Sequence, residues 1–156
     1  MKALHNISPT ALARSDALAR LWGLVALLGD HMESGLAERG LTLARAEVVW
    51  QLQLDGPTTQ QALSRALRVT PRNITGLVDG LEADGIVARK PHPSDRRATL
   101  VSLTDKGATL ARTMRREQDG FAQDLFEGVS LPELATFVSV MDRVLSRIRK
   151  ALPESV

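Results

Sequence analysis

The spacing of apolar residues predicts a mainly helical chain. Between Leu12 and Glu38 they recur every three or four positions, which places them on one face of an amphipathic helix. This face consists of Leu18, Leu21, Trp22, Val25, Leu28 and Met32. Gly40 ends the helix, because glycine accepts the left-handed conformation found after a helix. Thr42 can cap a second helix that stops at Gly56. Its inward residues are Val48, Val49 and Leu52.

Two short helices joined by a turn follow. Thr58 and Gln61 fit a capping box at the start of the first, and Thr70-Pro71 caps and begins the second. Gly85 closes the second helix. The predicted buried positions of the pair are Leu63, Ala66, Leu67, Ile74, Leu77, Val78 and Leu81. Two short helices with a tight turn between them describe a helix-turn-helix.

A β-hairpin and two long helices complete the pattern. Residues 86–90 and 99–103 have the composition of paired strands, and the segment between them is polar, rich in turn residues and basic at its far end. A helix-turn-helix followed by such a hairpin is a winged helix. Thr104 then caps a helix to about Phe126, with apolar residues at Leu110, Met114, Phe121 and Leu125. After a break at 128–132, a last helix places Leu134, Phe137, Val138, Met141, Val144, Leu145 and Ile148 along one side. The predicted fold is mainly α with a small β-hairpin wing.

The element order divides the chain into two regions. Residues 41–103 form the winged helix-turn-helix, and residues 1–40 and 104–156 form a helical region outside it. Both outer segments carry long apolar stripes, which a small monomer cannot easily bury. We therefore expect a homodimer joined through these terminal helices.

Composition excludes several classes of function. The chain has 0 Cys, so it can hold no disulfide, no thiolate zinc site and no cysteine nucleophile. No run of 18 uncharged apolar residues is present, and the first residues lack the apolar segment of a signal peptide. We expect a cytoplasmic protein without a membrane span. Aromatic residues make up only 3%, which argues against a base-stacking platform for single strands.

The positive charge is concentrated in one part of the chain. Residues 65–97 contain seven basic and four acidic residues, so this segment alone is more basic than the whole chain, whose net charge is +2. The basic residues are Arg65, Arg68, Arg72, Arg89, Lys90, Arg96 and Arg97. Such clustering is compatible with a nucleic-acid surface.

The second short helix carries side chains suited to reading base pairs. The face opposite its apolar stripe displays Arg72, Asn73, Gly76, Asp79 and Gly80, with Thr75 at the flank. Asparagine can pair with adenine, arginine with guanine, and the threonine methyl group can contact thymine. Each glycine weakens the helix by about 1 kcal/mol relative to alanine, which the close approach of a major-groove wall would explain. A solvated helix face is the alternative.

The predicted wing offers a second contact with DNA. An arginine within Asp95-Arg96-Arg97 can enter a narrow minor groove, and Asp95 can orient its guanidinium. An ordinary solvated turn is the alternative. Arg89, Lys90, Thr59 and Gln60 are predicted phosphate contacts.

The segment from Leu41 to Gly107 resembles the MarR family of bacterial transcription regulators. The matching pieces are Leu41-Thr42, Leu63–Leu67, Val69–Thr75, Leu77–Glu82, Gly85–Arg89, Asp95–Arg97 and Leu103–Gly107. They cover less than half of the chain but occur in the family's order and spacing. By position, the family's Asp-x-Arg wing motif falls on Asp95 and Arg97, and its recognition positions fall on Thr70, Arg72, Asn73, Thr75 and Gly76.

The resemblance implies a function for the whole chain. It implies a homodimer on a short pseudo-palindromic duplex, with recognition helices in major grooves and wings in minor grooves. Family members usually repress neighbouring genes and release DNA when a small aromatic or anionic compound binds. One branch senses oxidants through cysteines, and the absence of cysteine excludes that branch here.

The sequence offers five candidate residues for an effector pocket. Trp22, His31, Met32 and Trp50 lie on helices that line the family's pocket, and Arg112 could meet an anion. An ordinary core position or a solvated charge explains each of these five residues better than an effector contact does.

Other classes of function have less support. The three histidines form no metal-binding pair, and the chain has neither a glycine-rich phosphate loop nor a Gly-x-Ser-x-Gly motif. We expect no enzyme activity, no metal and no cofactor. The remaining alternatives are a non-specific architectural DNA-binding protein of the same fold and a helical adaptor that has lost DNA binding.

Overall fold

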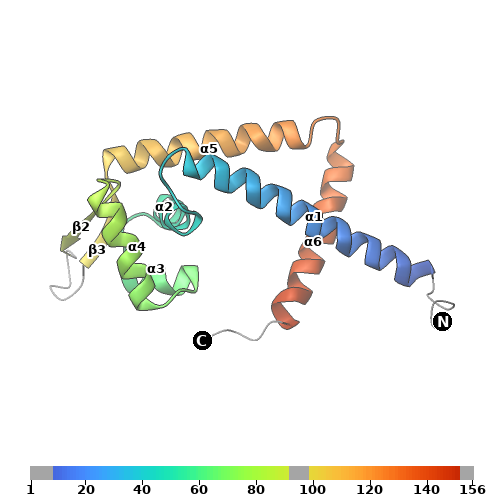
Figure 1. Ribbon diagram of the computed structural model, residues 1–156, viewed down its shortest axis with the longest axis horizontal. Helices are drawn as coiled ribbons and strands as arrows, with labels where there is room; N and C mark the ends of the chain where they lie inside the picture. Colours follow the sequence, from blue (N-terminus) through green and yellow to red (C-terminus); the bar gives the residue numbers. More distant parts are fainter. Residues whose placement is uncertain (1–8, 92–98, 152–156) are drawn as a thin grey trace. The chain divides into compact units, whose positions relative to one another are not determined.

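The computed structural model describes residues 9–91 and 99–151, which fall into two compact units, Met1–Ala111 and Arg112–Val156. Figure 1 labels the helices α1 (Pro9–Ala37), α2 (Leu43–Asp55), α3 (Gln60–Leu67), α4 (Pro71–Ala83), α5 (Asp105–Leu125) and α6 (Leu131–Ala151). The strands are β1 (Thr58–Thr59), β2 (Val87–Pro91) and β3 (Thr99–Leu103). The mainly helical prediction is confirmed, and the grouping of 1–40 with 104–156 stays a prediction.

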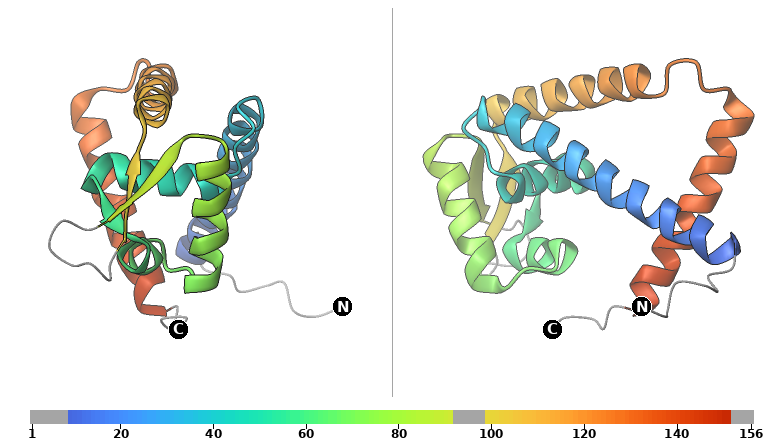
Figure 2. Two further views of the ribbon diagram at one scale, coloured as in Figure 1. Left: turned by 90° about the vertical axis from the view of Figure 1, so that its left-hand side faces the viewer. Right: turned by 45° about the vertical axis from the view of Figure 1, so that its right-hand side comes forward.

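The core of the first unit lies among α2, α3, α4 and the sheet (Figure 2). Its fully buried large side chains include Val48, Val49, Leu63, Ile74, Val78, Leu81, Val87 and Val101. One predicted core residue of α3 is wrong, since Ala66 is exposed and Ser64 is buried in its place. The Ser64 hydroxyl donates a 2.6 Å hydrogen bond to the Val69 carbonyl, so burial of this polar residue fixes the turn between α3 and α4.

Threonine side chains cap the helices α2, α3 and α4. Thr42 and Thr70 accept hydrogen bonds from the amides of Arg45 and Asn73, at 3.4 and 3.2 Å, as the sequence predicts. The third cap is Thr59, which accepts from Ala62 at 3.2 Å. The predicted capping box at Thr58 is therefore wrong by one residue.

The sheet explains this shift. It is antiparallel with three strands in the order β1-β3-β2, and Thr58 and Thr59 pair with Val101 and Leu100 of β3. The predicted pairing of residues 86–90 with 99–103 is confirmed, with Val87 opposite Leu103 at one end. Because β1 has only two residues, it shows no alternating pattern from which it could be predicted.

The start of α5 is fastened to the segment before β2. The Thr104 amide donates to the Ile86 carbonyl at 3.0 Å, and the Thr104 hydroxyl accepts from the Gly107 amide at 3.1 Å. Gly107 lies against that same Ile86 carbonyl, so closely that an added Cβ would overlap its oxygen. This close approach requires glycine at position 107.

In the second unit, Ser130 precedes α6 and donates from its hydroxyl and amide to the Glu133 carboxylate, at 2.6 and 3.0 Å. These two bonds lower the pKa of the Glu133 carboxyl below its ordinary value. The rings of Phe126 and Phe137 lie 5.9 Å apart. No residue of α6 is buried, so its predicted apolar stripe remains largely accessible in the single chain.

Gly107→Ala should destabilise the first unit. Alanine in a helix is favoured over glycine by about 1 kcal/mol. The new Cβ must however displace the Ile86 backbone, and such overpacking costs about 1–3 kcal/mol, so we expect a net loss. Gly76→Ala is the control, because nothing lies within 4 Å of its added Cβ and stability should rise. Urea unfolding followed by circular dichroism measures both, and equal stability of the two variants contradicts the assignment.

Candidate nucleic-acid interface

The first two turns of α4 present an exposed row of side chains. Thr70 caps the helix and Pro71 occupies its first turn, while Arg72, Asn73 and Thr75 are exposed. Gly76 continues the row and is open, with no neighbouring atom near its missing side chain. Four of these, Arg72, Asn73, Thr75 and Gly76, lie on the helix directly after its capping threonine. The structure thus brings all five predicted recognition residues together at one accessible helix end.

Gly80 has a different role from the one the sequence suggests. It is half-buried, and an added Cβ would lie 2.9 Å from the Arg45 Cζ atom. The Arg45 guanidinium crosses α4 at this point and pairs with Asp84 at 2.9 Å. Gly80 therefore makes room for an arginine of α2, whereas Gly76 is the glycine that leaves space on the exposed face.

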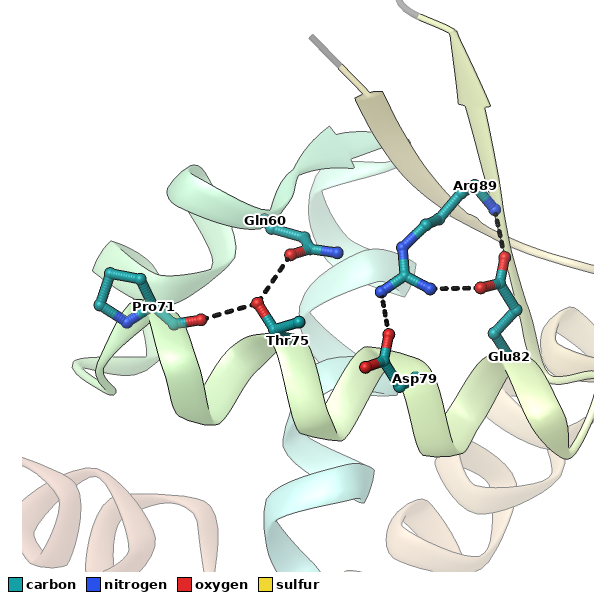
Figure 3. A network of polar contacts seen from close by, with 6 residues as sticks. All are labelled: Gln60, Pro71, Thr75, Asp79, Glu82 and Arg89. Carbon is teal, nitrogen blue, oxygen red and sulfur yellow. Dashed lines mark hydrogen bonds and ion pairs between the residues drawn. The ribbon is translucent and has the colours of Figure 1, made fainter.

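A charged cluster joins β2 to α4, and Figure 3 shows its arrangement. The Arg89 guanidinium on β2 pairs through Nη2 with Asp79 and through Nη1 with Glu82, both on α4. The Arg89 amide also donates to Glu82 Oε1 at 3.1 Å. Sequence reasoning missed these partners, although the i, i+3 spacing of the two acids places them on one side of α4.

Gln60 and Thr75 extend this cluster to α3. Thr75 Oγ1 donates to the Pro71 carbonyl at 2.8 Å, and its single proton cannot also serve the Gln60 carbonyl oxygen. With the Gln60 amide turned, its nitrogen donates to Thr75 at 3.1 Å and its oxygen accepts from Arg89 Nη2 and Nε at 2.9 and 3.0 Å. We adopt this orientation because it satisfies every group. The Arg89 guanidinium then contacts α3 as well as α4.

The cluster keeps Arg89 charged. Removal from water acts to lower the pKa of its guanidinium, but the hydrogen bonds to Asp79 and Glu82 and the charges of both carboxylates outweigh this and raise the pKa above its ordinary value. The side chain is only 24% exposed. Arg89 is thus a charged group whose hydrogen-bonding capacity is largely used within the chain.

The other predicted DNA contacts differ in their exposure, and some of them lie outside the described residues. Lys90 is exposed on β2, next to Arg89. The Thr59 hydroxyl caps α3 and is half-buried. The predicted wing residues Asp95, Arg96 and Arg97 lie outside the described residues. The phosphate and groove contacts of all these residues stay predictions.

The predicted effector residues are spread over both units, and a site that they share stays a prediction. Trp50 lines a hollow of about 340 Å³ between α2 and α3, together with Glu47, Gln51, Leu54, Ala66, Leu67 and Arg68. Its indole nitrogen is buried without a hydrogen-bond partner among the described residues. Trp22, His31 and Met32 lie exposed on α1, and Arg112 lies on α5 in the other unit.

Among residues 9–91 and 99–151, no group of three histidine or acidic side chains is placed to hold a metal ion. Within the same ranges, no helix is both long and apolar enough to cross a membrane.

Comparisons with known sequences agree with the arrangement of these elements. Residues 41–99 match the model of the MarR family. The chain is 27% identical over 134 residues to YdgJ, an HTH-type transcriptional regulator of Bacillus subtilis, covering 86% of this chain and 80% of the relative. It is also 27% identical over 111 residues to the multiple antibiotic resistance protein MarR of Salmonella typhimurium, covering 70% of this chain and 77% of that protein.

Solved structures show the same fold. Wild-type MarR of E. coli superimposes with a TM-score of 0.66 at 26% identity, covering 90% of this chain and 99% of that one. FabT of Streptococcus pneumoniae, solved in complex with DNA, gives a TM-score of 0.74 at 18% identity with the same coverage. At that identity the likeness to FabT concerns the fold alone.

Proposed function

The chain belongs to the MarR family of DNA-binding transcriptional regulators, and we propose that it acts as a homodimer that recognises a pseudo-palindromic duplex by its base sequence. The observation that carries this proposal is the exposed row at the start of α4. Arg72 and Asn73 offer two of the side chains best suited to pair with base edges, and the open Gly76 allows a groove wall to approach.

Contacts with the DNA backbone would fix the register of α4. We assign phosphate contacts to Lys90 and to the start of α3 at Thr59 and Gln60, and minor-groove contacts to the wing residues Arg96 and Arg97, with Asp95 orienting them. The solved complex of FabT with DNA supports the general mode, since the two chains share their fold.

Exposed apolar side chains support the homodimer. On α1, Trp22 is 67% exposed and Val25 is 60% exposed, and α6 leaves Phe137, Val138 and Ile148 accessible. A second copy of the chain would cover these faces and hold two recognition helices at a fixed separation. Successive turns of one duplex face require a separation of about 34 Å.

An effector would act on that separation. A small aromatic or anionic compound that binds better to a dimer with another separation lowers DNA affinity by its differential affinity for the two states. Trp22, His31, Met32, Trp50 and Arg112 remain the residues proposed for such a site. By this mechanism the protein would repress a promoter until the compound binds.

A competitor titration tests sequence recognition directly. Duplexes are first enriched by the wild-type chain from a random-sequence pool, and the bound labelled duplex is then challenged with a shuffled duplex of the same composition. We expect the shuffled competitor to be at least about 10³-fold weaker, as is typical of specific binding. Equal competition would instead identify the non-specific architectural protein of the same fold.

Asn73→Ala should relax the preference for one base pair in each half-site. Loss of a bidentate contact costs about 1–3 kcal/mol on the enriched duplex. Affinity for the shuffled duplex should not change, because that complex depends on phosphate contacts. Fluorescence anisotropy on duplexes with single base-pair changes measures this. If Asn73→Ala weakens both duplexes alike, Asn73 does not read a base.

Val25→Asp should dissociate the proposed dimer. A carboxylate in the apolar face of α1 would be buried without a partner, so the sedimenting mass should fall from twice 17.0 kDa toward that of one chain. Ser34→Asp is the matched control, since nine residues along a helix place it on the opposite side of α1. Analytical ultracentrifugation compares the two variants. A wild-type chain that sediments as a monomer at micromolar concentration contradicts the homodimer.

A further inference from the structure

We propose that Arg89 is a positioning residue for sequence recognition, which holds α4, α3 and β2 in the arrangement that fits DNA, and that it does not bind phosphate. This inference rests on the proposed function and deepens it. It replaces the phosphate contact that the sequence alone suggests for Arg89 with a role inside the protein.

The charges of the cluster argue against a phosphate contact. Arg89 faces two carboxylates, those of Asp79 and Glu82, so the three side chains together carry one negative charge. A phosphate that approached Arg89 would also meet the Asp79 carboxylate, whose side chain is 60% exposed. Removing Arg89 from its partners would leave those carboxylates facing a polyanion. Lys90, the next residue along β2, is exposed and forms no ion pair with a carboxylate in residues 9–91 and 99–151.

The hydrogen-bond geometry accounts for a positioning role. The fork of the Arg89 guanidinium directs one nitrogen to Asp79 and the other to Glu82, one turn apart on α4. Its remaining N–H groups, on Nε and Nη2, donate to the Gln60 side-chain oxygen at the start of α3. A lysine ammonium lacks this planar fork and cannot satisfy the same set of acceptors.

The cluster lies directly beside the reading surface. Gln60 links Arg89 to Thr75, and Thr75 is one of the exposed residues on the first turns of α4. Asp79 is one turn further along the same helix. Holding three elements in one geometry before DNA arrives avoids an ordering cost on binding, so the cluster should affect affinity for the correct duplex most strongly.

Two neighbouring residues of β2 provide a matched test. Arg89→Gln, Arg89→Lys and Lys90→Gln are compared by fluorescence anisotropy on the enriched duplex and on the shuffled duplex, across a range of salt concentrations. We expect both Arg89 variants to lose about tenfold in affinity on the enriched duplex, the size of a single specificity contact, with little change on the shuffled one. Lys90→Gln should weaken both duplexes and reduce the slope of log K against log salt by about 0.9, as loss of one phosphate contact does.

The variant Asp79→Asn distinguishes a positioning role of the Arg89 cluster from a simple effect of its charge on DNA binding. This change removes a negative charge from an exposed position, so charge alone predicts tighter binding to every duplex, while the positioning role predicts weaker binding to the enriched duplex. Because Asp79 is largely exposed, this variant also serves if an Arg89 variant fails to fold, which thermal unfolding reports.

Failure of the positioning role of Arg89 and failure of the proposed function give different results. If Arg89→Gln reduces the salt slope as Lys90→Gln does, and Arg89→Lys restores wild-type binding, Arg89 is a phosphate contact and the inference is overturned. Unchanged affinity of the Arg89 variants, or tighter binding by Asp79→Asn, overturns it as well. If the wild-type chain enriches no sequence from the pool, the proposed function itself has failed.

Discussion

The pairing of one arginine with two carboxylates organises the surface that we propose this protein presents to DNA. Arg89 leaves β2 and meets Asp79 and Glu82 on α4, while Gln60 closes the cluster from α3. The side chains come from three elements that are separate in sequence, so the cluster links these elements in addition to the buried core that they share. Partial removal from water makes these contacts stronger than those of an exposed ion pair. The position of α4 relative to β2 and α3 is thus held in part by a group that, in our proposal, does not touch DNA.

Small residues complete the same framework. Gly80 admits Arg45 across α4, and Gly107 admits the Ile86 carbonyl at the start of α5. Both are close approaches inside the protein, whereas Gly76 leaves space on the outer face. Glycines within one domain therefore serve two purposes, and only the neighbouring atoms distinguish them.

Local features of the structure could be predicted from the sequence, and long-range ones could not. The periodicity of apolar residues and the threonine caps at Thr42 and Thr70 depend on residues within one turn, so the helices were predictable. The two-residue strand β1 forms only by pairing with β3. Because Thr58 and Thr59 form this strand, α3 begins one residue later than the sequence predicts, with Thr59 as its cap. The partners of Arg89 likewise lie 7 and 10 residues away and meet it through folding. The five residues predicted to read DNA could be grouped from the sequence because they all lie at the start of one capped helix, and their contacts with DNA stay a prediction.

If Arg89 is a positioning residue, its guanidinium stays turned toward α4 and α3 when DNA is bound. The most direct measurement is the ¹⁵N NMR spectrum of the arginine side chains, assigned for Arg89 and recorded with and without the enriched duplex. We expect the Arg89 Nε and Nη signals to keep their frequencies and their slow rotation about the guanidinium bonds, because Asp79, Glu82 and Gln60 remain its partners. A large shift of these signals on addition of the duplex, with loss of the carboxylate contacts, would contradict it.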